Sequence, residues 1–373
     1  MRINSNKCYT HGNGRDCMRI LLISLALIIY SGITFYIGYN IRALMASFQI
    51  TPKPILFWGI LYVVAFAFVI ARFHESLGFL AVIGNYWMFV IQYGLLLCII
   101  SNILIKFTPL STKVVGTGAL SIFVILFVMG TYYAYTPVVH QQTIKIDKQG
   151  EPMRVVVGSD FHLGILSNKR HLQNFVTRSN EQNPDLVLLV GDIIDDDPGQ
   201  YIKQNMMDVM DDLTATYGVY GVLGNHEYYG KKIEAFNEAM KQSNVTILMD
   251  ETVELPNGVY LTGREDITNQ QRQPLSALAP EQVNKPWLVM NHTPNDLSEP
   301  QKENVDFHVS GHTHRGQLWP NQYITKRTFD LDYGYQMWGD LHALVTSGYG
   351  FWGPPMRIGT QAELWVIDIE YTK

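Results

Sequence analysis

The stretch VDFHVSGHTH, residues 305–314, begins as a short apolar run and ends in two histidines separated by one residue. Such a run favours a buried β-strand. Alternate residues of an extended chain point to the same side, so His312 and His314 can reach one point in space. Taken alone, the motif is equally consistent with a metal site and with a strand end that holds two incidental histidines.

Four other stretches have the same layout, with a run rich in Val, Ile or Leu before a group of polar residues. They are MRVVVGSD (153–160), PDLVLLVGD (184–192), GVYGVLGNHE (218–227) and KPWLVMNHT (285–293). Helical patterns lie between the early ones, at about 168–183, 202–216 and 233–242, and QAELWVIDIEY (361–371) alternates like a half-buried strand. This alternation of strands and helices predicts an α/β sheet with helices outside it.

The polar residues arrive at the carboxyl ends of these predicted strands, and ligands in open α/β sheets bind off those ends. Each piece alone is a weak signal, because Asp-x-His is often a loop accident, and Gly-Asp or GNHE is often only a turn or a helix cap. Together they predict a metal site, and mixed Asp, His and Asn ligands suit Mn, Fe or Zn better than Ca or Mg. The converging residues are Asp160, His162, Asp192, Asn225, His226, His292, His312 and His314.

The first part of the chain has a different composition. Residues 1–140 contain two acidic residues and nine Lys or Arg, a net +7, and the remainder has 31 acidic residues and 19 Lys or Arg, a net −12. Long segments without charged residues are each near the ~20 residues that span a bilayer as a helix. We therefore predict four transmembrane helices, at about Ile20–Tyr39, Ile55–Phe73, Phe79–Ile105 and Val114–Tyr135.

The predicted organisation is an N-terminal tail over 1–18, a transmembrane domain over 19–136 and an α/β domain over 140–373. A signal peptide would explain only the first apolar segment. The distribution of Lys and Arg favours an N-terminus on the inner side, which with four helices predicts a cytoplasmic α/β domain of a multi-pass protein in the cell membrane. If the chain starts at Met18, this bias nearly vanishes.

The motif set resembles the calcineurin-like metallophosphoesterase superfamily, over about residues 150–315. It comprises Asp160-x-His162, Gly191-Asp192, Gly224-Asn225-His226-Glu227, His292 and Gly311-His312-Thr313-His314. The segment SGYGFWGPPMRIG (347–359) resembles the end of a subgroup of membrane-associated bacterial phosphoesterases similar to YkuE and YaeI.

This resemblance implies a four-layer α/β/β/α sandwich and two divalent metal ions. Asp160, His162 and His314 would hold one ion, and Asp192 would bridge the two. The second ion would be held by Asn225, His292 and His312. His226 would not be a ligand but would protonate the leaving oxygen or stabilise charge on the phosphoryl group.

Two arginines are predicted as substrate contacts. Arg315 stands where many relatives have glycine, so it either touches substrate or points to solvent. Arg357 could clamp a phosphate or form a structural salt bridge. Of the acids after Asp192, we expect Asp196 and Asp197 to belong to a solvated helix start, and we leave Asp195 open between that role and support of the metal ligands.

The predicted function is that of a membrane-anchored dimetal phosphohydrolase, which cleaves a phosphodiester or pyrophosphate by metal-activated hydroxide. Membrane anchoring makes a lipid or lipid-linked substrate attractive. The alternatives are a nucleotide-directed phosphodiesterase and a non-catalytic membrane scaffold on the same fold. No nucleic-acid partner is expected.

Overall fold

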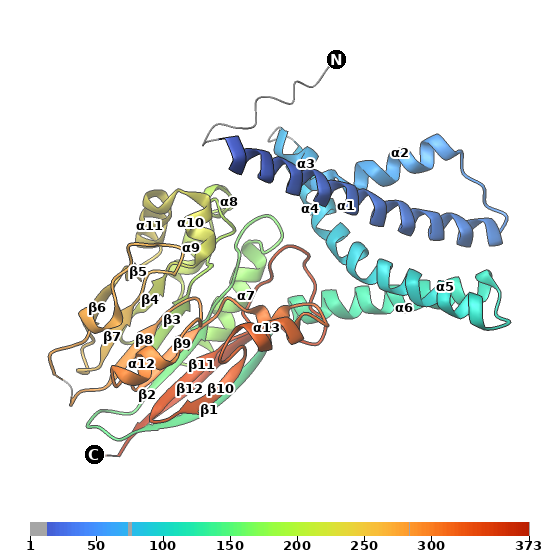
Figure 1. Cartoon of the computed structure of the whole chain (residues 1–373). Helices are drawn as coiled ribbons and strands as arrows, with labels where there is room; N and C mark the ends of the chain where they lie inside the picture. The colour runs from blue at the N-terminus through green and yellow to red at the C-terminus, as the bar shows by residue number, and fades with distance from the viewer. Residues whose placement is uncertain (1–12, 74–76, 283, 373) are drawn as a thin grey trace. The chain divides into compact units, whose positions relative to one another are not determined.

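The computed structural model describes residues 13–73, 77–282 and 284–372 (Figure 1). The chain divides into two compact units, Met1–Leu126 and Phe127–Lys373. The division falls inside one long helix, so the last residues of that helix belong to the second unit. Most of the predicted tail, residues 1–12, lies outside the described residues.

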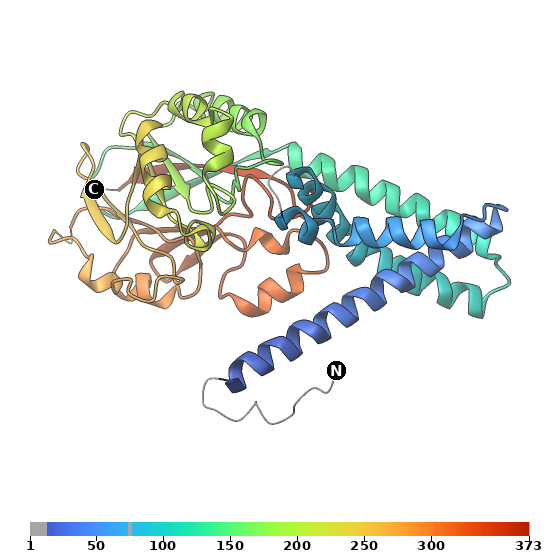
Figure 2. The same ribbon diagram turned by 90° about the horizontal axis from the view of Figure 1, so that it is seen from above.

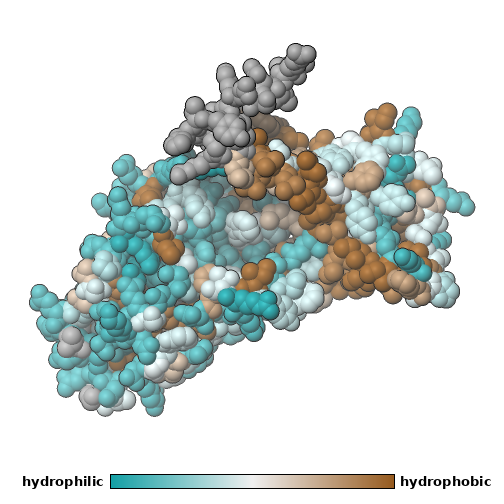
Figure 3. Space-filling model, in the orientation of Figure 1, coloured by the Kyte–Doolittle hydropathy of each residue, from teal (hydrophilic) through white to brown (hydrophobic). Residues whose placement is uncertain are grey.

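In its described part, the first unit consists of helices joined by short turns and contains no β-strand. Three of its helical segments are long and apolar enough to cross a membrane: Met18–Ser47, Phe79–Phe107 and Thr112–Tyr135. Hydrophobic side chains cover much of this unit's visible surface in Figure 3, whereas the second unit is largely hydrophilic. The elements are α1 (Asn13–Ser47), α2 (Pro54–Ala65), α3 (Ala67–Ile70), η1 (Ala71–Phe73), α4 (Gly78–Phe89), the π-helical η3 (Val90–Gly94), α5 (Leu95–Phe107) and α6 (Thr112–Tyr135).

The predicted second membrane helix, Ile55–Phe73, is wrong as a continuous helix. Helix α2 has 12 residues, about 18 Å at ~1.5 Å per residue, which is short of the ~30 Å of a bilayer core. The backbone leaves helical geometry at Phe66 (φ −97°, ψ 11°), and the Tyr30 hydroxyl donates to the Ala65 carbonyl there. The Tyr30 hydroxyl of α1 thus gives the Ala65 carbonyl a hydrogen-bond partner beside the break. Such a partner is needed because lipid offers none to an exposed backbone carbonyl.

The first sheet of the second unit has the strand order β1-β12-β2-β3-β4-β5. Only the β12–β2 pair is antiparallel. The strands are β1 (Val138–Ile146), β12 (Glu363–Tyr371), β2 (Met153–Gly158), β3 (Leu186–Val190), β4 (Val219–Val222) and β5 (Val245–Ile247). Its connections contain α7 (Lys169–Asn180), α8 (Gly199–Lys203), α9 (Met206–Asp211), α10 (Asn225–Gly230) and α11 (Ile233–Gln242).

The second sheet has the order β10-β11-β9-β8-β7-β6, with antiparallel pairs at its two edges and parallel pairs in the middle. Its strands are β10 (Gly334–Trp338), β11 (Leu341–Val345), β9 (Phe307–Ser310), β8 (Trp287–Met290), β7 (Tyr260–Gly263) and β6 (Glu251–Glu254). Its connections contain η4 (Leu275–Ala277), α12 (Ser298–Lys302), η5 (His314–Gly316) and α13 (Gln322–Thr328).

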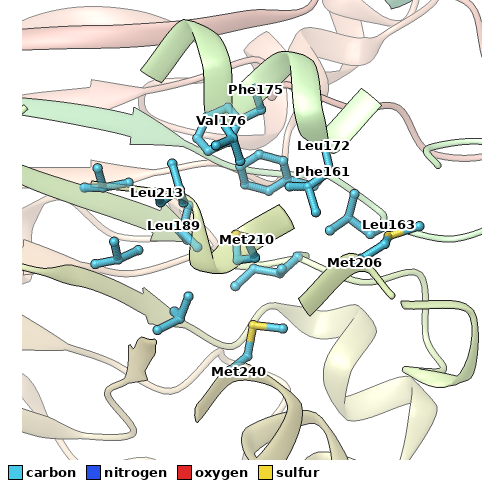
Figure 4. Packing of buried hydrophobic residues seen from close by; sticks show 14 of the residues in the cluster. Phe161, Leu163, Leu172, Phe175, Val176, Leu189, Met206, Met210, Leu213 and Met240 are labelled. Carbon is cyan, nitrogen blue, oxygen red and sulfur yellow. The ribbon is translucent and has the colours of Figure 1, made fainter. Parts of the chain in front are cut away.

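Two apolar cores stabilise these sheets. One lies between the first sheet and the helices α7, α9 and α11, and is filled by side chains such as Phe175, Met210 and Met240 (Figure 4). The other contains side chains of both sheets, including Val157 and Leu288, so the sheets pack against each other. Full burial of each large apolar side chain contributes about 1.5–3 kcal/mol. In Figure 2 the green-to-yellow helices lie on one side of the sheets and the orange ones on the other.

The predicted α/β fold is confirmed, with two mixed sheets, and every predicted strand is present. The predicted helix over 233–242 matches α11, and α7 begins after Asn168, whose side chain accepts from two backbone amides as an N-cap. The predicted helix over 202–216 is instead divided into α8 and α9. Asn205 lies in the left-handed region between them (φ 49°), which an α-helix cannot accommodate.

Candidate metal centre

The eight predicted polar residues all follow strand ends. Asp160 and His162 follow β2, Asp192 follows β3, and Asn225 and His226 begin α10 after β4; His292 follows β8, and His312 and His314 follow β9. Because β2, β3 and β4 are parallel, as are β8 and β9, these ends gather at one rim. The structure therefore brings all eight together.

The backbone at this rim is strained. Five of these residues have a positive φ: Asp160 (54°), His162 (45°), Asp192 (47°), His312 (69°) and His314 (48°). Each such conformation costs of order 1–3 kcal/mol for a residue with a side chain, and it persists only where the surroundings fix it. The turns are fixed by bonds between loops, since Asp160 N donates to Gly191 O and His162 N donates to Asp192 O. These strained conformations therefore lower the stability of the fold but fix the direction of these side chains.

One group of ligand atoms comes from Asp160, His162 and His314, whose donor atoms lie within 4.8 Å of one another. The Nε2 atoms of the two histidines are 3.1 Å apart, and His314 Nε2 is 3.4 Å from Asp160 Oδ1. All three side chains are buried. A carboxylate oxygen and two imidazole nitrogens at this spacing form a donor set that suits a transition-metal ion.

A second group comes from Asp192, His292 and His312. His292 Nε2 is 3.2 Å from Asp192 Oδ2, and His312 Nδ1 is 2.8 Å from Asn225 Oδ1. Asp192 Oδ2 is also 3.7 Å from His162 Nε2 of the first group. Asp192 therefore lies between the two groups.

The contacts of His292 fit a bound cation. Its Nδ1 is 2.8 Å from the Val190 carbonyl, which can only accept, so Nδ1 holds the proton. Its buried Nε2 lies 3.2 Å from Asp192 Oδ2. Either a proton or a metal cation between these two atoms would satisfy both of them. A backbone carbonyl that fixes the tautomer of a metal-binding histidine in this way is a common arrangement.

Burial keeps three of the histidines neutral, the form that binds a metal. It lowers the pKa of His162 to about 3, and burial together with the nearby charge of His292 lowers the pKa of His312 to about 4. Burial also holds the pKa of His314 well below its ordinary value. His292 is the exception: burial lowers its pKa, but the charges of Asp192 and Asp160 raise it well above the ordinary value. These carboxylates attract a positive charge at this point.

His226 differs from the ligand-type histidines. Its Nδ1 is 2.7 Å from Asp196 Oδ1 and 3.6 Å from Asp195 Oδ1, and its backbone N donates to Asp192 Oδ1 at 2.9 Å. Burial lowers the pKa of His226, but the hydrogen bond with Asp196 and the charges of Asp192 and Asp195 outweigh it and raise the pKa to about 9. His226 is therefore a protonated side chain at the edge of the cluster.

The expectation that Asp196 belongs to a solvated helix start is correct about its exposure (53%) but wrong about the helix. Helix α8 begins at Gly199, and Asp196 has a left-handed backbone (φ 56°) with its carboxylate hydrogen-bonded to His226. Asp195 lies 4.0 Å from His162 Nδ1, which places it beside the cluster as well. Asp197 is exposed and pairs with Lys232 at 2.6 Å. All three side chains are about half exposed, and what sets Asp197 apart is its ion pair with Lys232 in place of a contact with the cluster.

Glu227 is a residue of this site that the sequence prediction gave no role. Its buried carboxylate accepts from three backbone amides, those of Gly224 (2.7 Å), Ile194 (3.0 Å) and Asp192 (3.2 Å). It thereby ties the loop after β3 to the loop after β4. Burial and the charge of Asp192 raise the pKa of Glu227 to about 8. Its position as the third residue of α10 is the capping-box signal that would have identified it.

Asp160 is held by the segments that follow β9 and β11. Its two carboxylate oxygens accept from His312 N at 3.0 Å each, and Gly350 N donates to the Asp160 carbonyl at 3.0 Å. Gly348 has φ 87°, and a Cβ there would lie 2.7 Å from the Asp160 Cβ. The SGYG segment, residues 347–350, thus approaches the site with its backbone.

The two predicted substrate arginines differ in their surroundings. Arg315 is partly exposed, with its guanidinium 4.1 Å from the centre of the Tyr333 ring, and its φ of 49° explains why glycine is favoured at this position. Arg357 is fully buried, and its guanidinium donates to the carbonyls of Ser347, Gly348 and Gly350. Arg357 therefore has a structural position, and clamping of a substrate phosphate by it is not supported.

The α/β fold thus presents a rim of Asp, His and Asn side chains of the kinds that bind transition-metal ions. Residues 153–316 match the family model of the calcineurin-like phosphoesterases. This part of the chain is thus similar to that family, as its motifs predicted.

Several curated proteins with similar sequences are described as metallophosphoesterases or as containing a metallophosphoesterase domain. An uncharacterized metallophosphoesterase of Campylobacter jejuni is 29% identical over 64% of each chain. A zebrafish (Danio rerio) transmembrane protein with a metallophosphoesterase domain is 28% identical over 66% of this chain and 60% of its own length. The uncharacterized metallophosphoesterase YkuE of Bacillus subtilis is 25% identical over 59% of this chain and 79% of its own. The chain spans 62–64% of the length of the first curated relatives that it matches.

Proposed function

We propose that this protein is a membrane-anchored phosphohydrolase that uses two divalent cations to cleave a phosphoester bond. The observation that supports this most directly is the pair of donor groups with Asp192 between them. In this proposal Asp160, His162 and His314 hold one cation. Asn225, His292 and His312 hold the other.

When bound, the cations would supply positive charge to the phosphoryl oxygens and lower the pKa of a water molecule. The protein's own residues position the reactants. Asp192 orients both donor groups, and its second oxygen accepts from the His226 amide. The His226 imidazole donates through Nδ1 to Asp196, which leaves an Nε2 proton for the leaving oxygen. Mn, Fe or Zn fits this ligand set.

The substrate class is a phosphodiester or pyrophosphate, with a lipid or lipid-linked molecule favoured by membrane anchoring. We further propose a multi-pass anchor over residues 19–136, followed by a four-layer α/β/β/α domain over 140–373. We propose that α2, α3 and η1 cross the membrane together as a broken helix after α1. This fourth crossing would put the N-terminus and the catalytic domain on one side, proposed as cytoplasmic. A reporter fused after Lys373 and assayed in the cytoplasm and outside it tests this orientation.

The activity is tested with full-length protein loaded with Mn²⁺, using bis-p-nitrophenyl phosphate as substrate. We expect Asp192→Asn to lose bound metal by elemental analysis. His226→Ala should keep its metal and lose about 10²–10⁴ in kcat, because it removes only the proton donor. Equal hydrolysis by the wild type and both variants would rule out this site. Arg315→Ala, assayed alongside, tests the predicted substrate contact through KM.

A further inference from the structure

Exposed hydrophobic side chains of the second unit are concentrated in one place. Within residues 138–372, as far as they are described, nine large hydrophobic side chains are exposed. Five of them belong to segments that connect to the end of α6, and we name these five the lip. They are Ile165 (46%), Trp319 (46%), Tyr323 (63%), Ile324 (65%) and Trp352 (49%).

The lip connects to α6 through three segments. Tyr135 of α6 donates from its hydroxyl to the Leu166 carbonyl, beside Ile165, and its ring contacts Phe351, beside Trp352. Ile358 is the third link, because its carbonyl accepts from Trp319 N at 2.9 Å and from the Gln322 side chain of α13 at 3.0 Å. A Cβ on Gly130 of α6 would lie 3.0 Å from the Ile358 side chain.

The same part of α6 lies where a membrane helix leaves the hydrocarbon. The candidate span ends at Tyr135, and Tyr132 and Tyr133 fit the aromatic belt of an interface. Arg357 N donates to the Gly130 carbonyl and Ala362 N donates to the Tyr133 carbonyl. Gly130 and Tyr135 are about 7.5 Å apart along the helix axis at ~1.5 Å per residue. The segment that binds here therefore lies at the depth of the lipid headgroups.

The charges of α13 suit an anionic surface. Lys326 and Arg327 are exposed in its last turn, next to the exposed apolar pair Tyr323 and Ile324. Asp330 follows, so residues 322–330 have a net charge of +1. A helix with apolar and basic side chains exposed is suited to an interface between lipid and water.

The lip is also continuous with the candidate metal centre. His314 and Arg315 belong to η5, and Gln317 directly after it exchanges two hydrogen bonds with Trp352. Helix α13 follows five residues later. A bilayer in contact with the lip would therefore lie beside the residues that approach the substrate.

We propose that the lip binds the headgroup layer of an anionic lipid bilayer and that the substrate is a lipid whose phosphoester enters the metal centre from this layer. The substrate part of this inference rests on the proposed function, whereas the docking part does not. The two parts can therefore be tested separately.

Docking is tested without catalysis, by spin labels in full-length protein whose three native cysteines are replaced by serine. The protein is reconstituted in nanodiscs of phosphatidylcholine and phosphatidylglycerol. A label on Ile324→Cys should be more accessible to oxygen than to a water-soluble nickel complex. A label on Met337→Cys, an equally solvent-exposed site on β10 (45%), should show the reverse. Equal nickel accessibility at both sites would overturn the docking proposal.

The substrate is tested with the double variant Tyr323→Ser/Ile324→Ser and the control Met337→Ser. Phosphatidylglycerol in the nanodisc is the lipid probe, and bis-p-nitrophenyl phosphate is the soluble one. We expect the double variant to lose about tenfold on the lipid probe, the effect of ~1.4 kcal/mol of lost apolar burial, and to keep its activity on the soluble probe. Equal losses on both probes, or no loss on either, would overturn the proposal. If the wild type hydrolyses neither probe, the proposed function fails while the spin-label result still stands.

Discussion

The carboxylate of Glu227 accepts a hydrogen bond from the backbone amide of Asp192 at 3.2 Å, across two loops that follow neighbouring strands. Asp192 has a positive φ, so its conformation depends on such contacts from outside its own loop. Glu227 contacts none of the proposed cations' ligand atoms. It nevertheless sets the position of the residue that lies between both donor groups.

We expect Glu227→Gln to destabilise the protein by about 1–3 kcal/mol, because the amide nitrogen cannot accept and one buried backbone N–H loses its partner. Metal content should fall with it. Thermal denaturation and elemental analysis measure both effects. Glu234→Gln is the matched control, since Glu234 is exposed on α11 and should leave both unchanged. A wild-type melting temperature and metal content in Glu227→Gln would contradict this role.

Gly348→Ala should be more harmful than Gly334→Ala, although both glycines have a positive φ (87° and 90°). The backbone strain of about 1–3 kcal/mol is common to both. At Gly348 the new Cβ also meets Asp160, whereas at Gly334 nothing lies within 4 Å. Overpacking should add about 1–3 kcal/mol at Gly348 and lower activity. Denaturant unfolding and turnover check this, and equal effects of the two variants would show that Gly348 does not position Asp160.

Asp196→Asn should lower the pH at which His226 loses its proton, without removing metal. The negative charge of Asp196 helps to raise the pKa of His226 to about 9, so its loss lowers that pKa and deprotonates His226 at a lower pH. We expect the alkaline limb of the kcat profile to move down by about one pH unit. Asp197→Asn is the control, because Asp197 pairs with Lys232 instead. An unchanged alkaline limb would show that His226 is not the titrating group.

Removal of metal should lower thermal stability, because cations that bind only the folded state stabilise it. At a free metal concentration 100 times Kd, the gain is about 2.7 kcal/mol. For a domain of this size that corresponds to roughly 5–10 °C in Tm. Scanning calorimetry of chelated and reloaded protein measures the shift. Asp192→Asn should show a smaller shift, and a full shift in that variant would place the metal elsewhere.

The sequence predicted the convergence at the metal centre because parallel strands bring their carboxyl ends to the same rim. Asp160, Asp192 and His292 could be located by this rule alone. This rule could not predict that the Asp196 carboxylate contacts His226. That contact depends on the left-handed backbone of Asp196, in a loop whose sequence has no periodic pattern. Local composition also gave no sign of the break at Phe66, which depends on a hydroxyl from another helix. For Arg357, only the fold shows that three carbonyls surround its guanidinium.

The hydrogen bonds from Arg357 N and Ala362 N to carbonyls of α6 have a mechanical consequence. A membrane helix changes its tilt when the bilayer is thinner or thicker than its apolar length. Tilting α6 would move the carbonyls of Gly130 and Tyr133, and with them the segment that holds Asp160. We expect turnover of a soluble substrate to vary with the acyl-chain length of the surrounding lipid, and a constant rate across chain lengths would exclude this coupling. If turnover does vary with chain length, the membrane anchor makes the catalytic rate depend on the thickness of the bilayer.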